Sequence, residues 1–330
     1  MSNVFDIHNH IFIPDAFQSI PDRYKEDIPK LIDDHGRVFI RIGKDVRGPV
    51  PRTFFSVPER LEEMRLEGVN VEAISVFPYT FFYHLDVDEA AVFSSSQNNA
   101  MYEIIKENQK SFYGLATVPL QDTYEAIKEM ERAITHLKMI GVEIGSNVNG
   151  KNLDDETLRP FFKRAEELGT LLLVHPADVL GKERMSKYYQ SVIVGNICDI
   201  SLAISSIIFG GVLDEFPKLK ICFSNAGGFL PYQIGRLDQG YLVRDEPKKN
   251  INEKPSRYLE RIFIDTTIYD VRALRFLINT MGAENVLLGT DSPVDMHDHY
   301  IVSKVRSLEI PESDKESIFW GNIRRLLPNI

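Results

Sequence analysis

Phe5-Asp6-Ile7-His8-Asn9-His10-Ile11 is the stretch near the N-terminus from which the fold can be worked out. Read as a β-strand, it places Asp6, His8 and His10 on one face and its apolar residues on the other. A barrel strand of this kind would present its apolar face to helices and its histidines to the lumen. Two histidines spaced i, i+2 can both bind one metal ion, although they can also be ordinary polar residues at a strand end.

From residue 58 onward, segments with strand and helix character alternate along the chain. The predicted helix 58–68 starts with Pro58 and ends with Gly68, as helices do. A stripe of apolar and small residues predicts another helix over 123–138. After the first, strands are expected at 70–77, 111–118, 141–145, 171–175, 219–225, 261–266 and 285–290. The remaining helices are expected at 89–108, 154–168, 191–215, up to about 242, 270–281 and 312–326.

This rhythm predicts an α/β fold. Eight strands, nearly all followed by a helix, indicate a parallel sheet, and eight such units predict a (β/α)8 TIM barrel with its site at the C-terminal strand ends. A doubly wound open sheet is the alternative, but no Gly-x-Gly-x-x-Gly turn follows the first strand. Because we find no domain boundary, we expect a single barrel domain over residues 1–330.

The segment 14–56 interrupts the pattern after the first strand. It is rich in Pro, Asp and Arg, and only 37–42 alternates as a strand does. We therefore expect an inserted loop or small hairpin here, and loops this long are usually part of a lid or an active-site wall.

Composition restricts the partners. The net charge of -10 argues against nucleic acid and anionic membranes. No apolar run approaches the roughly 20 residues of a membrane span, and no signal peptide is recognisable. Cys198 and Cys222 stand in apolar surroundings, as buried thiols of a reducing compartment do. A soluble cytoplasmic protein is predicted.

Polar residues with metal-binding chemistry fall where the predicted strands end. The first strand supplies His8 and His10, strand five ends in His175, strand six in Asn225, and strand eight is followed by Asp291. In a barrel these ends face the same opening. Three imidazoles and one carboxylate suit zinc or a similar divalent ion and leave room for a water. A single metal site is therefore predicted.

Several motifs resemble those of a known family. They are the opening His-x-His, Val-His-Pro (174–176), Gly-Gly-Val-Leu-Asp-Glu-Phe-Pro (210–217), the stretch 216–223 leading to a Gly-Gly turn and Gly-Arg (235–236), and Leu-Gly-Thr-Asp (288–291). They look like the amidohydrolase superfamily, in the branch that contains 2-amino-3-carboxymuconate 6-semialdehyde decarboxylase. The likeness runs nearly from end to end.

The resemblance implies one zinc ion held by His8, His10, His175 and Asp291. Dinuclear relatives carry a carboxylated lysine at the end of strand four; the strand here, 141–145, has none, which favours a mononuclear site. Glu143 on that strand is expected to be a packed residue or to lie behind the ligands.

The resemblance also implies two arginines that hold substrate carboxylates. The first matches Arg47, with Arg52 as a competitor in the same loop, and the second matches Arg236. Guanidinium groups suit this role because they pair bidentately with carboxylates and stay charged. Because the family donates the second arginine from a neighbouring subunit, a homodimer or higher homo-oligomer is expected.

Three positions depart from the family pattern. Asn225 replaces a histidine that helps to deprotonate the metal-bound water, and Ala177 and Ser292 replace a Trp and a Tyr. Asparagine cannot take a proton at neutral pH but can form hydrogen bonds. Asp291 is then the first candidate to carry the proton, and further candidates are His84, His297 and His299.

Two functions follow. The first is a metal-dependent, non-oxidative decarboxylase, a carbon–carbon lyase, acting on a small unsaturated or aromatic carboxylic acid. The alternative is a metal-dependent hydrolase of an amide, lactone or ester on the same site, with Asp291 moving the proton. A degenerate binding protein is a third reading, disfavoured by the intact ligand set.

Overall fold

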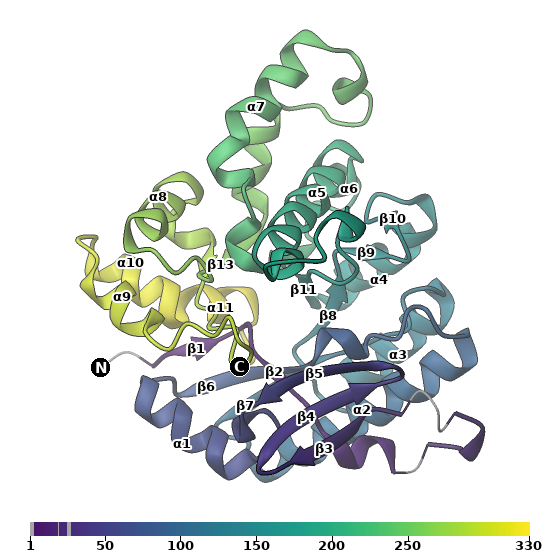
Figure 1. Ribbon diagram of the computed structural model, residues 1–330. Coiled ribbons are helices and arrows are strands. Elements are labelled where there is room, and N and C mark those ends of the chain that lie inside the picture. The colour runs from purple at the N-terminus through teal and green to yellow at the C-terminus, as the bar shows by residue number, and fades with distance from the viewer. Residues whose placement is uncertain (1–2, 19, 25–27) are drawn as a thin grey trace.

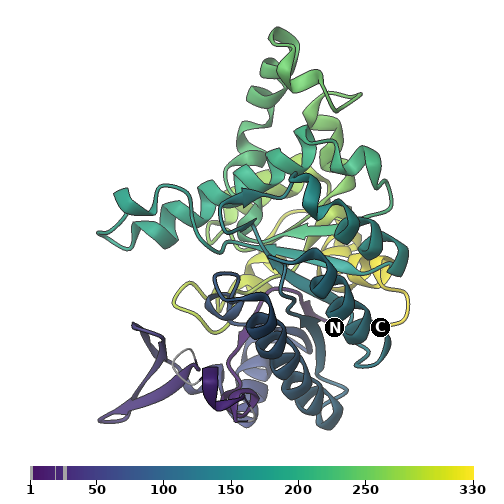
Figure 2. The same cartoon turned by 90° about the vertical axis from the view of Figure 1, so that its right-hand side faces the viewer.

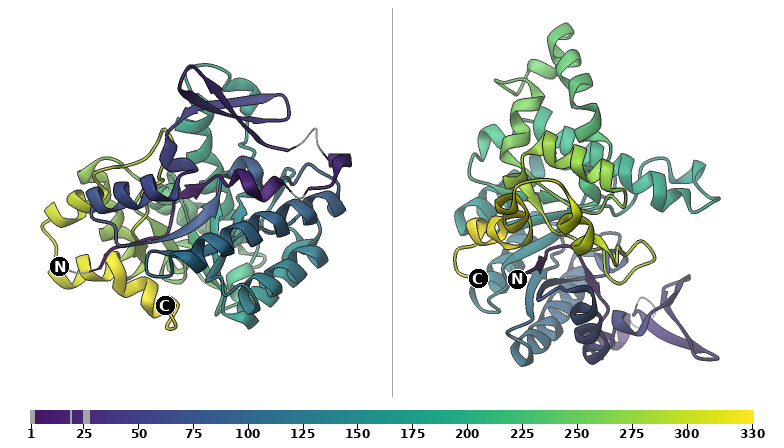
Figure 3. Two further views of the ribbon diagram at one scale, coloured as in Figure 1. Left: turned by 90° about the horizontal axis from the view of Figure 1, so that it is seen from below. Right: turned by 90° about the vertical axis from the view of Figure 1, so that its left-hand side faces the viewer.

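The structure is a computed structural model that describes residues 3–18, 20–24 and 28–330. A sheet of parallel strands lies at its centre, surrounded by helices (Figures 1 and 3). A second short strand, β2 (His10–Ile11), continues the first and pairs with the same neighbour, β6. In the order in which they pair, the strands are β1 (Phe5–Asp6), β6 (Val71–Val76), β7 (Phe112–Ala116), β8 (Gly141–Gly145), β11 (Leu171–His175), β12 (Lys220–Phe223), β13 (Phe263–Asp265) and β14 (Val286–Leu287).

Contacts between the first and last strands close the barrel. The Ile7 N–H donates to the Leu288 carbonyl at 2.9 Å, and Asn9 forms a parallel bridge with Ser292. The prediction of a (β/α)8 barrel is confirmed, and the open sheet is wrong. Strands β8 and β11 have the predicted bounds, whereas β14 covers only two residues of the predicted 285–290.

Most of the helices pack around the outside of the barrel. Helix α1 has Pro58 in its first turn and ends at Gly68, whose φ of 79° is in the left-handed region that glycine adopts without strain. The helices are α1 (Val57–Glu67), α2 (Val87–Glu107), α3 (Thr123–Thr135), α4 (Arg159–Leu168), α5 (Asn196–Phe209), α6 (Val212–Glu215), α7 (Leu230–Val243), α8 (Val271–Met281), α9 (Ile301–Ser307), α10 (Glu312–Glu316) and α11 (Asn322–Leu326).

The first strand differs from the predicted alternation. Phe5 and Ile7 pack in one buried cluster with Leu171 and Leu173, which share a face of β11 with His175, whereas Ile11 belongs to the other main cluster. The reason is a break in the strand between β1 and β2. The histidines therefore reach the lumen through an irregular segment and not through simple alternation.

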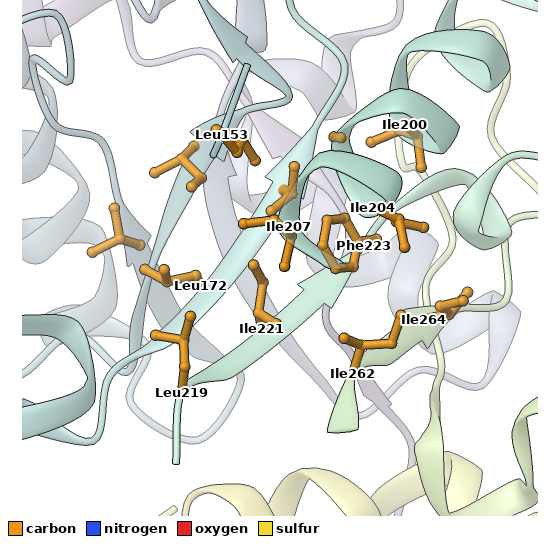
Figure 4. Packing of buried hydrophobic residues seen from close by; sticks show 14 of the residues in the cluster. Leu153, Leu172, Ile200, Ile204, Ile207, Leu219, Ile221, Phe223, Ile262 and Ile264 are labelled. Carbon is orange, nitrogen blue, oxygen red and sulfur yellow. The ribbon is translucent and has the colours of Figure 1, made fainter. Parts of the chain in front are cut away.

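The opposite faces of the strands pack against helices. Leu172, Ile221 and Phe223 point toward Ile204 and Ile207 of α5 in the same buried cluster (Figure 4). Strands buried on both faces explain the nearly continuous apolar runs in the sequence. This packing fixes the strand ends that carry the site.

The segment after the first strand forms a separate antiparallel sheet in the order β3 (Lys30–Asp34), β4 (Arg37–Ile42), β5 (Asp45–Val50). It projects from the barrel at the lower left of Figure 2. The predicted strand 37–42 is its central strand. Residues 19 and 25–27 of the predicted insertion lie outside the described residues. A small hairpin, β9 (Asn147–Val148) with β10 (Lys151–Asn152), follows β8.

One helical segment, Ser191–Phe209, meets the length and composition of a membrane span. It consists of the π-helical turn Ser191–Gly195 and α5, and it is strongly apolar. The sequence reading that no apolar run approaches this length is wrong here. Half of this apolar stretch is buried inside the fold.

Candidate metal centre

Four predicted residues come together at the C-terminal ends of the strands. His8 lies between β1 and β2, His10 begins β2, His175 ends β11, and Asp291 follows β14. One ligand atom from each lies within 4.8 Å of all the others. The three imidazole ring centroids are 4.8–5.1 Å apart, and all four residues are buried. We refer to these residues as the four-residue centre.

A carboxylate on β13 orients His8. The Nδ1–H of His8 donates to Asp265 Oδ2 at 2.5 Å, because a carboxylate can only accept. Asp265 is itself held by the backbone N–H groups of Ala226 (2.7 Å) and Thr267 (3.1 Å) and by the Thr267 hydroxyl (2.8 Å). Sequence reasoning missed Asp265, although it ends strand seven and the rule used for the other strand ends would have found it.

Backbone carbonyls lie beside the same ring nitrogen of the other two histidines. The Nδ1–H of His175 donates to the Pro176 carbonyl at 2.7 Å, and that of His10 to the Val76 carbonyl at 3.3 Å. A hydrogen bond at Nδ1 sets the tautomer and leaves the Nε2 lone pair for a metal.

The atoms facing one another in the centre fit a cation. Asp291 Oδ1 lies 3.4 Å from His8 Nε2 and 3.3 Å from His10 Nε2. All three atoms are buried and have no hydrogen-bond partner among the described residues. Buried polar atoms without a hydrogen-bond partner cost free energy of folding. A divalent ion would coordinate all three atoms at once. The donor set is also the one that zinc-type ions prefer.

The pKa shifts of His8 and His10 also indicate surroundings that favour a cation. Burial by itself lowers the pKa of His8, but Asp291, Asp265 and Glu143 outweigh it and raise that pKa to about 9. Burial, followed by the positive charge of His8, lowers the pKa of His10 well below its usual value. Clustered carboxylates thus create a negative potential that favours a positive charge in the centre.

Glu143 on β8 lies directly behind the centre. Its Oε1 is 3.8 Å from His10 Nδ1, and among the described residues neither carboxylate oxygen has a hydrogen-bond partner. Burial raises the pKa of Glu143 to about 8. The predicted place behind the ligands agrees with this position.

A cavity of about 1250 Å³ opens at the centre. His10, His175 and Asp291 line it on the barrel side, and residues of β4 and β5 line the opposite wall. That wall and the neighbouring loops contribute several cationic side chains, which are Lys30, Arg41, Lys44, Arg47 and Lys182. The projecting sheet is therefore a wall of the cavity.

The two competing loop arginines have different surroundings. Arg47 lines the cavity, its guanidinium lies 4.3 Å from the ring centroid of Tyr79, and its buried Nε has no hydrogen-bond partner among the described residues. Its recorded ion pair, with Asp45, is 3.5 Å long. Arg52 is exposed, pairs with Glu59 at 2.6 Å and does not line the cavity. Of the two arginines, Arg47 is therefore the one that lines the cavity.

Neither Arg236 nor Asn225 lines this cavity. Arg236 is exposed on α7, the helix that projects at the top of Figure 1. The Asn225 side chain accepts a hydrogen bond from the Ser224 hydroxyl at 2.8 Å, and its φ of 51° lies in the left-handed region that asparagine tolerates. Among the further histidines, His84 lines the cavity, whereas His297 and His299 do not.

Comparison with known proteins agrees with this geometry. The sequence pattern of the amidohydrolase family matches residues 5–328. The chain is 34% identical over 327 residues to a 2-amino-3-carboxymuconate-6-semialdehyde decarboxylase of Dictyostelium discoideum, covering 98% of this chain and 90% of the relative. It is 25% identical over 246 residues to a gamma-resorcylate decarboxylase of Polaromonas, covering 69% of this chain and 74% of the relative.

A solved structure has the same fold. The 5-carboxyvanillate decarboxylase of Sphingomonas paucimobilis superposes with a TM-score of 0.84 at 25% identity, covering 99% of both chains. The match of the family pattern to nearly the whole sequence, together with the barrel and its histidine and aspartate centre, leads to one conclusion: the chain belongs to the amidohydrolase family.

Proposed function

We propose that the protein is a metal-dependent, non-oxidative decarboxylase of a small unsaturated or aromatic carboxylic acid. The observation that carries the proposal is the cavity that joins the four-residue centre to Arg47. The likeness to decarboxylases over nearly the whole chain supports it.

Arg47 binds a carboxylate of the substrate in this proposal. Its guanidinium is fixed against the Tyr79 ring and is only weakly paired within the protein, so its donors are available to an anion. A planar guanidinium suits a carboxylate because both groups can form two parallel hydrogen bonds.

The four-residue centre would hold one divalent ion, which supplies Lewis-acid chemistry at a substrate oxygen. Asp291 opens on the cavity and carries the proton that adds to the carbon bearing the departing carboxylate. The bond from that carbon to the carboxylate then breaks, carbon dioxide leaves, and the bonding electron pair stays on the substrate. The net change is one carboxylate replaced by one hydrogen.

Asn225 would act as a hydrogen-bonding group near the ion and not as a base. Its amide cannot take a proton at neutral pH, and its backbone N–H donates to Asp265, the partner of His8, at 3.2 Å. We therefore assign the proton to Asp291.

The metal we propose is zinc, on the basis of three imidazole nitrogens and one carboxylate. Elemental analysis of protein purified without added metal would show zinc in excess of manganese and iron. Manganese as the main metal would contradict the assignment to zinc but leave the site itself intact.

Arg236 is proposed to serve the cavity of a second copy of the chain. It lies on the projecting α7 beside the exposed side chains of Tyr232, Leu242 and Val243, which a homodimer would cover. Light scattering on a sizing column would then give at least the mass of two chains, whereas a stable monomer would contradict this role.

We also retain two proposals from the sequence: a single barrel domain over 1–330 and a cytoplasmic location. Cys198 and Cys222 are free thiols, which supports a reducing compartment.

The reaction type can be tested with a panel of substrates. We expect carbon dioxide release from one or more aromatic or muconate-type carboxylic acids and no turnover of amides, lactones or esters. Hydrolysis of a lactone or amide without carbon dioxide release from any acid would replace the proposed decarboxylase with the hydrolase.

Arg47→Ala is expected to lower kcat/KM by about 10- to 100-fold, mainly through KM, because it removes a charge-assisted hydrogen-bond donor to the substrate. Arg52→Ala is the matched control, since Arg52 lies nearby but outside the cavity. Equal effects of the two substitutions on steady-state kinetics would contradict the assignment of Arg47.

A further inference from the structure

A second group of histidines and carboxylates lies outside the cavity. Glu63 and Glu67 are one turn apart on α1, and His297 and His299 are two residues apart in the segment after β14. One ligand atom from each lies within 4.8 Å of the others. His297 Nε2 is 3.0 Å from Glu67 Oε2, and His299 Nδ1 is 2.6 Å from Glu67 Oε1. We refer to these four residues as the outer cluster.

The carboxylates of the outer cluster face histidines and not Lys or Arg. Among the described residues, no Lys or Arg forms a recorded ion pair with Glu63 or Glu67. The neighbouring Glu62, by contrast, is paired with Arg65 at 2.6 Å. A divalent cation would add positive charge that these two carboxylates otherwise receive only from the imidazoles.

The two imidazoles are held close together. The ring centroids of His297 and His299 are 3.9 Å apart with the planes 44° from each other, and both rings are turned to Glu67. The residue between them, Asp298, points elsewhere and pairs with Lys304 at 2.6 Å. The His-x-His spacing thus places one nitrogen of each ring next to the Glu67 carboxylate.

We propose that the outer cluster binds a second divalent cation of the zinc class. Two imidazole nitrogens and two carboxylate oxygens from two elements form a nitrogen and oxygen donor set suited to such an ion. Neither the outer cluster nor its chemistry depends on the proposed decarboxylase reaction.

The ion would join α1 to the segment that carries Asp291. Ser292 Oγ lies 3.5 Å from Glu63 Oε2, and the Ser292 carbonyl accepts the backbone N–H of His10 at 2.6 Å. A cation at the outer cluster therefore restrains the residue next to Asp291. Its role is to position this segment and not to contact the substrate.

Metal binding can be counted with zinc alone. After loading with zinc and dialysis against a weak chelator, the wild-type protein is expected to retain about two equivalents by elemental analysis. Glu67→Gln/His299→Ala should retain about one, and His175→Ala should also retain about one. Glu62→Gln is the matched control on the same helix and should keep both.

The single variant His299→Ala should fold normally, because the His299 side chain is 56% exposed. In a competition titration it should weaken binding of the second zinc ion by about tenfold or more. Loss of a residue that only hydrogen-bonds to a metal ligand already has an effect of this size. Circular dichroism would check the fold of each variant. A wild type that never exceeds one equivalent, or a second equivalent that survives unchanged in Glu67→Gln/His299→Ala, would overturn the proposal.

Activity gives an independent comparison. Two equivalents of zinc with no carbon dioxide release would contradict the decarboxylase while leaving the outer cluster supported. One equivalent with normal release would contradict the outer cluster alone.

Discussion

Asp291→Asn is expected to lower kcat for carbon dioxide release by about 10²- to 10⁴-fold while the protein remains folded. Asparagine keeps the shape of the side chain and tolerates the φ of 60° found at this position. It removes the negative charge that faces His8 and His10 and the group that carries the proton. The effect should therefore fall on catalysis and not on stability.

Asp295→Asn provides the matched control for that experiment. Asp295 lines the same cavity, but its recorded partner is the exposed Tyr189, whose hydroxyl is 3.4 Å away. We expect kcat to change by less than about tenfold in this variant because Asp295 is not one of the four residues of the centre and is hydrogen-bonded by Tyr189 instead. Near-normal turnover by Asp291→Asn would remove Asp291 from the mechanism.

Arg60→Met is expected to destabilise the protein by about 3–5 kcal/mol, the range for breaking a buried ion pair by removing one partner. Arg60 is only 1% exposed, and its Nε donates to Glu72 at 2.5 Å. Its terminal nitrogens donate to the His10 carbonyl at 2.6 Å and to Asn9 Oδ1 at 2.5 Å. The substitution leaves a buried carboxylate and two acceptors next to the first strand without a partner. Urea unfolding measures the loss.

Arg65→Met on the same helix is the comparison for Arg60. Its side chain is 66% exposed and pairs with Glu62, so its removal should leave the urea midpoint nearly unchanged. The double variant Arg60→Met/Glu72→Leu should recover part of the lost stability because it removes the unpaired carboxylate as well. Equal losses for the two arginines would show that the buried network contributes little.

The sequence predicted the barrel and the four-residue centre because both follow from local rules. Alternating strands and helices indicate parallel pairing, and parallel strands bring their C-terminal ends to one mouth. His175 and Asp291 could therefore be placed together although many residues separate them. Strands such as 171–175 were predicted with correct bounds because they are short, largely apolar and end in a polar residue.

Features that depend on distant contacts could not be predicted. The burial of Arg60 requires a carboxylate at 72 and acceptors near residue 10, which no local pattern reveals. The outer cluster joins Glu67 to His297 across 230 residues. Strands β3 and β5 were missed because much of each is exposed and their charged residues, with Gly48 and Pro49, hide any alternation.

The most direct test of the account is an anomalous-difference map from a crystal of zinc-loaded protein, recorded on both sides of the zinc edge. We predict a peak about 2.0–2.2 Å from the Nε2 atoms of His8, His10 and His175 and from a carboxylate oxygen of Asp291. A map with no zinc peak among these four side chains, from a crystal with zinc in its solvent, would contradict the central claim that they form a metal centre.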